Sequence, residues 1–364
     1  MRHKKEKSYL GLLFTLIVIL AIILTLLVLY SMNPQKMQEN MQYLSTKVDE
    51  YIAQLKGEPS SLKDDIEFPE EEKLTEAQRH YYYQQLSETG KKIYLTIEKN
   101  IDKIKNGEDN IPLPPSLNED AKSNEGGKDY IANEYQNAWD AFMTDKSEYF
   151  YIDSSRVCLV TKMISKGSNT NYEFFIGKGN NSNYFTSNFS SKEEVDQAII
   201  SVEKAKKNIV NNASGNNYEK IKYVHDWLVE NVKYDTANSK NTSNIYGCLV
   251  NGKVVCEGYA RAFKYLMDEL NIPCVLVSGT AVDENGKTER HAWNYVYIKN
   301  NWYAIDVTWD DPIIIGNGKI NDKIKYKYFL KGSDFMNKNH TPLGEVTKNG
   351  IKFEYPVLSK EDIK

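Results

Sequence analysis

The segment from residue 254 to residue 263, which reads VVCEGYARAF, constrains the fold of this chain more than any other. Cys256 stands where a short apolar run gives way to a helical pattern. Positions 256, 259, 260, 263, 266, 267 and 270 carry Cys, Tyr, Ala, Phe, Leu, Met and Leu. This spacing predicts one buried face of a helix that begins at Cys256. Asn271 and Pro273 indicate where that helix ends.

A cysteine in the first turn of a helix is suited to nucleophilic chemistry. The N–H groups of that turn have no acceptor within the helix and carry a partial positive charge, which favours a thiolate over a thiol. The same groups can donate to an oxyanion. Gly258 is expected to leave space above the sulfur for a substrate backbone. The alternative for Cys256 alone is a small core residue at a helix start, so its partners decide between the two.

The candidate partners, His291 and Asp306, fall on two consecutive predicted strands. Three strands are expected at residues 274–282, 290–298 and 302–308. A loop at Lys299 and Asn300 puts His291 and Asp306 on one face, within a diagonal reach of about 7 Å. A loop centred on Asn300 and Asn301 suits left-handed turns better, but in that register His291 and Asp306 are two residue pairs apart along the strands. We predict the first register, with or without a bulge, so that Asp306 orients the imidazole that shares the thiol proton.

Composition places the chain among globular proteins. Its 364 residues are 41% hydrophobic and 26% charged, and a formal net charge of −4 gives no reason to expect a nucleic-acid partner. The four cysteines form no C-x-x-C pair and no two histidines have a metal-binding spacing, so no zinc site is predicted. Cys158 and Cys274 are interpreted as small buried hydrophobes. A bridge between Cys248 and Cys256, which would silence the thiol until it is reduced, stays open.

Residues 9–32 contain no charged side chain, and about 20 apolar residues suffice to cross a bilayer. Arg2, Lys4, Lys5 and Lys7 precede this run, which places the N-terminus in the cytoplasm and the body outside. We therefore expect a single-pass membrane anchor with an extracytoplasmic C-terminal body. The alternative is a buried core helix, which is rarely apolar on every face.

The sequence divides into five parts with an α+β body. They are a cytoplasmic tail (1–8), a transmembrane anchor (9–32), a helical stalk and linker (33–128), the N-terminal α/β part of the body (129–212) and a catalytic core with a C-terminal extension (213–364). The alternative for the stalk is a partner-binding coiled coil. In the body, helices are predicted at 130–143, 190–210 and 218–232, and strands at 149–164 and 171–176. His225 lies on the apolar stripe of one helix and is interpreted as a packed histidine.

Several short motifs together resemble the transglutaminase-like superfamily, papain-like thiol enzymes with a Cys-His-Asp triad. The matching pieces are Val255-Cys256-Glu257-Gly258-Tyr259-Ala260, His291-Ala292-Trp293-Asn294, Trp302-Tyr303 and Asp306-Val307-Thr308-Trp309-Asp310. The resemblance runs from about residue 129 to the C-terminus and is to bacterial, membrane-anchored members. It implies a papain-like, transglutaminase-core fold. One departure is Val307, where the bacterial family often has proline.

The resemblance also implies roles for single residues. It makes Cys256 the nucleophile, His291 the base and Asp306 the orienting acid. It suggests Tyr246 as an oxyanion donor, with a packed aromatic as the alternative. Gly258, Trp293 and Trp309 are the expected substrate-cleft residues, and His340 with Tyr328-Phe329-Leu330 is expected to cover the edge of the site. Calcium serves some animal members, but no acidic loop here demands it, so neither metal nor cofactor is expected.

These expectations combine into an anchored thiol enzyme that cleaves or transfers acyl groups at peptide or glutaminyl amide bonds. Water as acceptor makes it a protease or amidase, and a lysine-like amine makes it a crosslinking acyltransferase. The resemblance favours hydrolysis slightly. The expected partners are protein or peptide substrates, cell-wall peptides among them, and the membrane. The alternative function is a non-catalytic adhesion or scaffold module on the cell surface.

Overall fold

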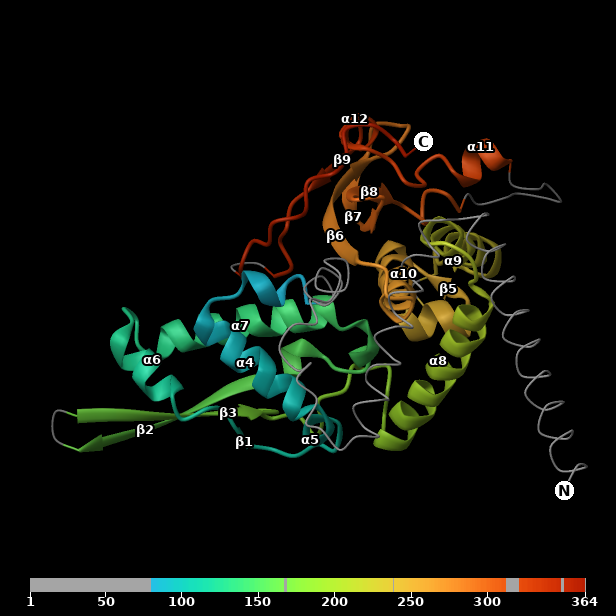
Figure 1. Ribbon diagram of the computed structural model, residues 1–364. Coiled ribbons are helices and arrows are strands. Elements are labelled where there is room, and N and C mark those ends of the chain that lie inside the picture. Colours follow the sequence, from blue (N-terminus) through green and yellow to red (C-terminus); the bar gives the residue numbers. More distant parts are fainter. Residues whose placement is uncertain (1–79, 167–168, 238, 312–320, 348–349, 364) are drawn as a thin grey trace, which may run out of the picture. The chain divides into compact units, whose positions relative to one another are not determined.

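The computed structural model describes residues 80–166, 169–237, 239–311, 321–347 and 350–363 (Figure 1). These residues all fall within one structural unit that runs from residue 69 to residue 364. The expected anchor at 9–32, the tail before it and residues 33–79 of the expected stalk lie outside the described residues. Within the described ranges, no helix combines the length and the apolar character needed to cross a membrane.

The described chain combines helices with two larger, antiparallel sheets, in agreement with the mixed α and β prediction. The first sheet has the order β1-β3-β2, the second has the order β8-β7-β6-β9, and β4 and β5 form a short parallel pair. The strands are β1 (Ile111–Pro112), β2 (Cys158–Lys166), β3 (Asn169–Gly177), β4 (Lys233–Tyr234), β5 (Lys253–Val254), β6 (Cys274–Val282), β7 (Thr288–Ile298), β8 (Asn301–Ile305) and β9 (His340–Pro342).

The helices predicted at 130–143, 190–210 and 218–232 are present as α7, α8 and α9, and each begins within two residues of the predicted start. The helices of the described residues are α4 (Glu88–Lys99), α5 (Ile101–Lys105), α6 (Leu117–Ser123), α7 (Lys128–Asp145), α8 (Lys192–Asn212), α9 (Asn217–Asn231), α10 (Cys256–Glu269), α11 (Asp322–Lys325) and α12 (Ser333–Met336). Short turns of other helix types are η1 (Tyr83–Gln85), η2 (Ser147–Tyr149), η3 (Ser154–Arg156) and the π-helical η4 (Gly247–Asn251). The Ser191 side chain caps the start of α8, since it accepts from Glu194 N.

The strand expected at 149–164 begins later than predicted, at Cys158. Residues 147–156 form the turns η2 and η3 instead, because Asp153 accepts hydrogen bonds from the backbone N–H and the hydroxyl of Ser155. An aspartate that bonds the backbone two residues ahead favours a turn over an extended strand.

The helix predicted from the cysteine motif is α10. It begins at Cys256, ends near Asn271, whose left-handed φ of 57° stops the helix, and buries Tyr259, Phe263 and Met267. Figure 1 shows α10 beside the second sheet, where it contacts β6 and β7. The first helical turn is therefore held against the middle of that sheet.

The register predicted for the hairpin of β7 and β8 is confirmed. Ile298 pairs with Asn301 and Tyr295 pairs with Ala304. Lys299 and Asn300 both have positive φ values, 51° and 61°, and form the two-residue turn. No bulge interrupts the described pairs between these strands.

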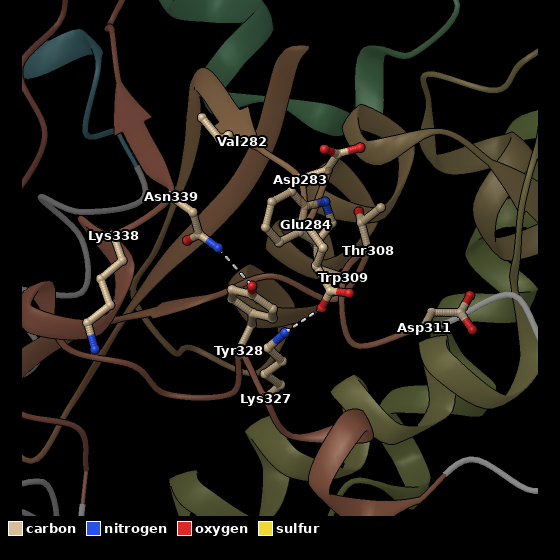
Figure 2. Close-up of a pocket in the computed structure, with 10 residues that line it drawn as sticks. All are labelled: Val282, Asp283, Glu284, Thr308, Trp309, Asp311, Lys327, Tyr328, Lys338 and Asn339. Carbon is tan, nitrogen blue, oxygen red and sulfur yellow. Dashed lines mark hydrogen bonds and ion pairs between the residues drawn. The ribbon is translucent and has the colours of Figure 1, made fainter. Parts of the chain in front are cut away.

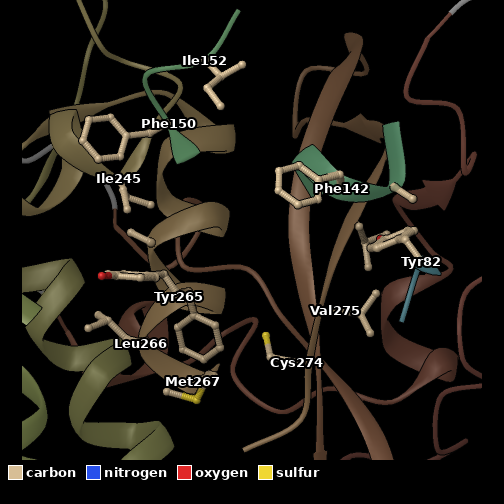
Figure 3. Close-up of a cluster of buried hydrophobic side chains, with 14 of the residues drawn as sticks. Tyr82, Phe142, Phe150, Ile152, Ile245, Tyr265, Leu266, Met267, Cys274 and Val275 are labelled. Carbon is tan, nitrogen blue, oxygen red and sulfur yellow. The ribbon is translucent and has the colours of Figure 1, made fainter. Parts of the chain in front are cut away.

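Residues 80–128, which the sequence assigned to a stalk and linker, contribute to the same hydrophobic core as the body. Tyr82 donates through its hydroxyl to the carbonyl of Leu276 on β6, and Ile111 pairs with Ile176 of β3. Figure 3 shows Tyr82 and Phe142 of α7 near Val275 of β6. The periodic apolar side chains of this segment are therefore buried against α7 and the two sheets.

Candidate active site

Cys256 is the first residue of α10 and is partly buried. It packs against Ala260 of its own helix, Leu276 of β6 and Ala292 of β7, so its side chain lies where the helix meets the sheet. The N–H groups of Gly258 and Tyr259 donate to the Val255 carbonyl. The amides of Cys256 and Glu257, which precede them, have no acceptor within the helix and are suited to bind an oxyanion.

His291 of β7 and Asp306, which follows β8, form a buried hydrogen bond. His291 Nε2 lies 2.7 Å from Asp306 Oδ2. A carboxylate only accepts, so Nε2 must carry a hydrogen, and neutral His291 then has its lone pair on Nδ1. The predicted register explains this pair, because Trp293 lies opposite the position of Asp306 and His291 lies diagonal to it.

The Asp306 carboxylate is buried and accepts four hydrogen bonds. Oδ2 accepts from His291 and from His340 Nε2 at 3.1 Å, and Oδ1 accepts from the backbone N–H groups of Thr308 and Trp309. Burial by itself would raise the pKa of this carboxyl group. The charge and hydrogen bonds of His291, with the bond from His340, outweigh burial and hold the pKa of Asp306 well below its usual range.

His291 also interacts with the thiol. Burial opposes a charge on the imidazole, but the Asp306 carboxylate and the side chain of Cys256 outweigh burial and raise the pKa of His291 to about 10. Since Nε2 is used by Asp306, Nδ1 is the nitrogen that faces the sulfur. The ring can therefore take a proton from the thiol on one side while the carboxylate stabilises the resulting charge on the other.

Two tryptophans hold the His291 ring. Trp293 stacks on it at a centroid distance of 5.9 Å, and Trp309 packs at 5.3 Å. Trp293 is 1% exposed, so it supports the imidazole from within the core and does not line an open cleft as the sequence suggested. Trp309 is partly exposed and also lines a cavity of about 500 Å³.

This cavity has aromatic walls and charges of both signs (Figure 2). Its lining comprises Val282, Asp283, Glu284, Thr308, Trp309, Asp311, Lys327, Tyr328, Lys338 and Asn339. Lys327 pairs with Glu284 at 3.1 Å. The cavity thus offers a polar, partly aromatic surface next to one of the tryptophans that support His291.

Two other sequence candidates have structural roles. A Cβ on Gly258 would lie 2.5 Å from Cβ of Val254 and 2.6 Å from the Thr242 carbonyl oxygen. Gly258 therefore allows close packing behind the helix and does not open space above the sulfur. The ring of Tyr246 packs against Phe150 and Phe189 at centroid distances of 6.1 and 6.0 Å, which agrees with the packed alternative.

All four cysteines are free thiols, including Cys248 and Cys256. Cys274 is buried as expected, and Cys158 is partly buried. Burial raises the pKa of the Cys248 thiol, which disfavours its reactive thiolate form. Within the described residues, Cys256 is therefore the thiol that adjoins an imidazole partner.

Comparison with known proteins identifies the segment that holds these groups. A family model for the transglutaminase-like superfamily matches residues 203–307. This segment belongs to the transglutaminase-like superfamily. It contains Cys256, His291 and Asp306, and it comprises α10 and most of the second sheet.

Two curated relatives match about a third of the chain. Kyphoscoliosis peptidase from Mus musculus is 26% identical over 137 residues, which are 34% of this chain and 21% of that protein. The Homo sapiens protein of the same name is 26% identical over 137 residues, 20% of its length. This chain thus spans about a fifth of the length of the curated relatives it matches.

Solved structures that resemble the chain include a crystal structure of a TGase and the periplasmic domain of TgpA from Pseudomonas aeruginosa bound to ethylmercury. The first is 16% identical, covers 53% of this chain and 53% of its own, and has a TM-score of 0.29. The second is 12% identical, covers 39% of this chain and 56% of its own, and has a TM-score of 0.25.

Near the site, Tyr234 was not among the sequence candidates, and His340 has a more direct contact than the sequence indicated. Tyr234 of β4 is exposed, and partial burial of its hydroxyl, together with the nearby charges of Cys256 and Glu289, raises its pKa. His340 lies 33 residues beyond the matched segment and reaches Asp306. The sequence suggested His340 only as cover for the edge of the site, because nothing local links it to Asp306.

The ligand-type atoms of His291, Asp306 and His340 lie within 4.8 Å of one another. Both imidazoles approach the same carboxylate oxygen, at 2.7 and 3.1 Å, which are hydrogen-bond distances. Two ligands of a tetrahedral zinc ion would stand farther apart, about 3.3 Å for bonds near 2.0 Å. Hydrogen bonding therefore explains this cluster better than a metal does.

Proposed function

We propose that this protein is a thiol enzyme that breaks amide bonds in peptides or proteins through an acyl-thioester on Cys256. The observation that carries the proposal is the His291 imidazole, held by Asp306 through Nε2 and adjoining the Cys256 side chain at its other nitrogen. The match of the surrounding segment to the transglutaminase-like superfamily supports it.

The first half of the reaction forms the thioester. His291 Nδ1 takes the proton of the Cys256 thiol, and the sulfur attacks the carbonyl carbon of the amide. The N–H groups of the first turn of α10 stabilise the negative oxygen of the tetrahedral intermediate. The carbon–nitrogen bond then breaks, and His291 gives its proton to the departing amine.

The second half transfers the acyl group to an acceptor. His291 takes a proton from water or from a primary amine, which attacks the thioester carbon. The carbon–sulfur bond breaks and the sulfur regains the proton from His291. Water yields a carboxylic acid, and an amine yields a new amide, so the acceptor that reaches the thioester decides between hydrolysis and crosslinking.

The cavity beside Trp309 supports a peptide substrate. It combines aromatic walls with the charged side chains of Asp283, Lys327 and Lys338, a surface that suits polar peptide segments better than lipid tails. Residues 9–32 supply the membrane anchor in this proposal, with the body outside the cytoplasmic membrane, where surface proteins and cell-wall peptides are the available substrates.

The test uses the full-length chain with a peptide library, with and without an isotopically labelled primary amine, and mass spectrometry of the products. We expect cleaved or deamidated peptides without amine and labelled adducts with it, both abolished in Cys256→Ala. Alkylation of Cys256 by iodoacetamide provides a readout that needs no substrate. An alkylation rate no faster than that of an ordinary thiol, together with no product that depends on Cys256, would instead favour a non-catalytic adhesion or scaffold module.

A further inference from the structure

We propose that His340 is a positioning residue of this site, which holds the Asp306 carboxylate in the orientation that His291 requires. The inference rests on the proposed function, because orientation of His291 matters for a reaction at Cys256. It concerns a residue that lies outside the segment matched by the superfamily model.

The fold brings His340 to Asp306 through β9. This strand pairs antiparallel with β6, with Ala281 opposite His340 and Gly279 opposite Pro342. A Cβ on Gly279 would lie 2.1 Å from the Thr341 carbonyl oxygen and 2.8 Å from the ring of Trp293. Only a residue without a side chain allows β9 to come this close.

The hydrogen bonds of Asp306 give His340 a specific task. Oδ1 is held by two backbone N–H groups. Among the described residues, the donors to Oδ2 are the two imidazoles, at 2.7 Å from His291 and 3.1 Å from His340. Without His340, the bond to His291 alone would have to orient Oδ2. A buried carboxylate that loses a donor loses part of the compensation for its lost hydration.

Both hydrogen bonds and ring contacts fix the position of the His340 side chain. Its Nδ1 lies 2.8 Å from Asn339 Oδ1, and Asn339 Nδ2 donates to the Tyr328 hydroxyl at 2.9 Å. Its ring packs on Trp309 at a centroid distance of 4.6 Å and on Trp293 at 5.0 Å. The two tryptophans that support His291 therefore also support His340, so both donors to Oδ2 are fixed by the same aromatic cluster.

His340 acts through Asp306 and not on the sulfur. Its Nε2 is used by the carboxylate and its Nδ1 faces Asn339, so neither nitrogen is left for the thiol. The expected consequence of its loss is a less well oriented His291 and a slower proton transfer from Cys256. Hydrogen bonds to a charged group are strong enough for an effect of roughly tenfold on the rate.

The test compares His340→Gln with His340→Asn in the full-length chain. Both variants introduce the same amide, but the Gln nitrogen can occupy the place of Nε2, whereas the Asn nitrogen is too short to reach Asp306. The alkylation rate of Cys256 by iodoacetamide is measured from pH 6 to pH 9. We expect about a tenfold loss for Asn at neutral pH and recovery to within about threefold for Gln. Lys162→Ala, which removes an exposed side chain on β2, outside the cavity and the site, serves as the control.

A second readout follows the His291 ring directly. The chain has five histidines, so selective ¹⁵N labelling gives few imidazole signals, and a His291→Gln variant assigns the relevant one. We expect the His291 Nε2–H signal to move in His340→Asn and to return in His340→Gln. The inference is overturned if His340→Asn keeps the wild-type alkylation rate and leaves the His291 signal unmoved. It is also overturned if His340→Asn and His340→Gln lose the same fraction of the alkylation rate.

The two readouts separate this inference from the proposed function. If wild-type Cys256 reacts no faster than an ordinary thiol, the proposed function fails, yet the His291 signal still reports whether His340 orients the pair. If the wild-type thiol is fast and both readouts are unchanged in His340→Asn, the proposed function stands and the role of His340 falls.

Discussion

The described part of the body includes two buried histidine–aspartate clusters with different capacities for chemistry. In the first, His291 donates to Asp306 through one nitrogen and faces Cys256 with the other. In the second, His225 of α9 is also buried, but its Nδ1 lies 3.1 Å from Asp226 and its Nε2 lies 3.1 Å from Asp310.

The difference lies in the second ring nitrogen. Burial opposes a charge on His225, but its two carboxylate neighbours outweigh burial and raise its pKa. With both nitrogens bonded to carboxylates, His225 has no lone pair left to accept a proton. The comparison teaches that a buried histidine–aspartate pair is by itself a structural feature. It becomes a candidate for catalysis when one nitrogen is left for a nucleophile.

The largest expected effect is that of Asp306→Asn compared with Asp310→Asn. An asparagine at position 306 can donate to Nε2 of His291 and so favours the wrong tautomer, which we expect to slow acylation of Cys256 by about 10³- to 10⁴-fold. Asp310→Asn should change the rate of the folded protein by less than about threefold. Acyl-enzyme formation with an activated ester, followed by mass spectrometry, measures both. If both variants lose the same fraction of the acylation rate, the two clusters do not differ in their role.

The second prediction compares the stability and the thiol reactivity of variants at the two histidines. His225→Gln leaves Asp310 buried without its charged partner, and breaking a buried ion pair costs about 3–5 kcal/mol in the free energy of unfolding. His291→Gln should cost less stability but slow the alkylation of Cys256 by about 10²-fold or more. Chemical denaturation and alkylation of both variants check this. The reverse assignment, a fast thiol in His291→Gln, would contradict the mechanism.

The third prediction concerns the glycine that admits β9. Gly279→Ala places a methyl group against the Thr341 carbonyl, so β9 must shift, at a cost of about 1–3 kcal/mol. Because His340 is on β9, the same variant should also slow the alkylation of Cys256, while the His225 signals in an imidazole spectrum stay in place. If Gly279→Ala has the stability of the wild-type protein, the placement of β9 does not depend on this close approach.

The smallest expected effect is on the pH dependence of the free energy of unfolding. The pKa of His291 is about 10 in the folded protein, above the ordinary value near 6.5 for an exposed imidazole. Its contribution to the free energy of unfolding is therefore fully present below pH 6.5 and is lost as the pH rises through about 10. Denaturation curves at pH 7, 9 and 10 should show this decline. The decline should be smaller in Cys256→Ser, since the cysteine side chain is one of the groups that raise the pKa.

Much of the site could be predicted because its parts are encoded by local patterns. Helical spacing after Cys256 places the cysteine in a first turn, and the turn residues Lys299 and Asn300 set the register that joins His291 to Asp306. Both inferences need only periodicities of a helix and a strand pair. The chain segment before residue 129 was harder, because its apolar stripe does not say which surface it will cover.

The errors at single residues have the same origin. Gly258 and Trp293 were expected at an open cleft, yet both are enclosed by elements that the local sequence does not specify. His340 was expected at an edge, and it lies within hydrogen-bonding distance of Asp306 across 34 positions of sequence. Contacts between distant segments depend on how the helices and sheets pack against one another. The spacing of residues along the chain does not encode this packing.

By itself, the sequence determined which thiol, imidazole and carboxylate belong together, since helix and hairpin geometry follow from neighbouring residues. Tertiary structure alone decided how the carboxylate is held, which tryptophan is exposed and which histidine stays locked between two acids. The reason is physical: local backbone preferences act over a few residues, whereas the burial and hydrogen bonding of a side chain depend on every element packed around it.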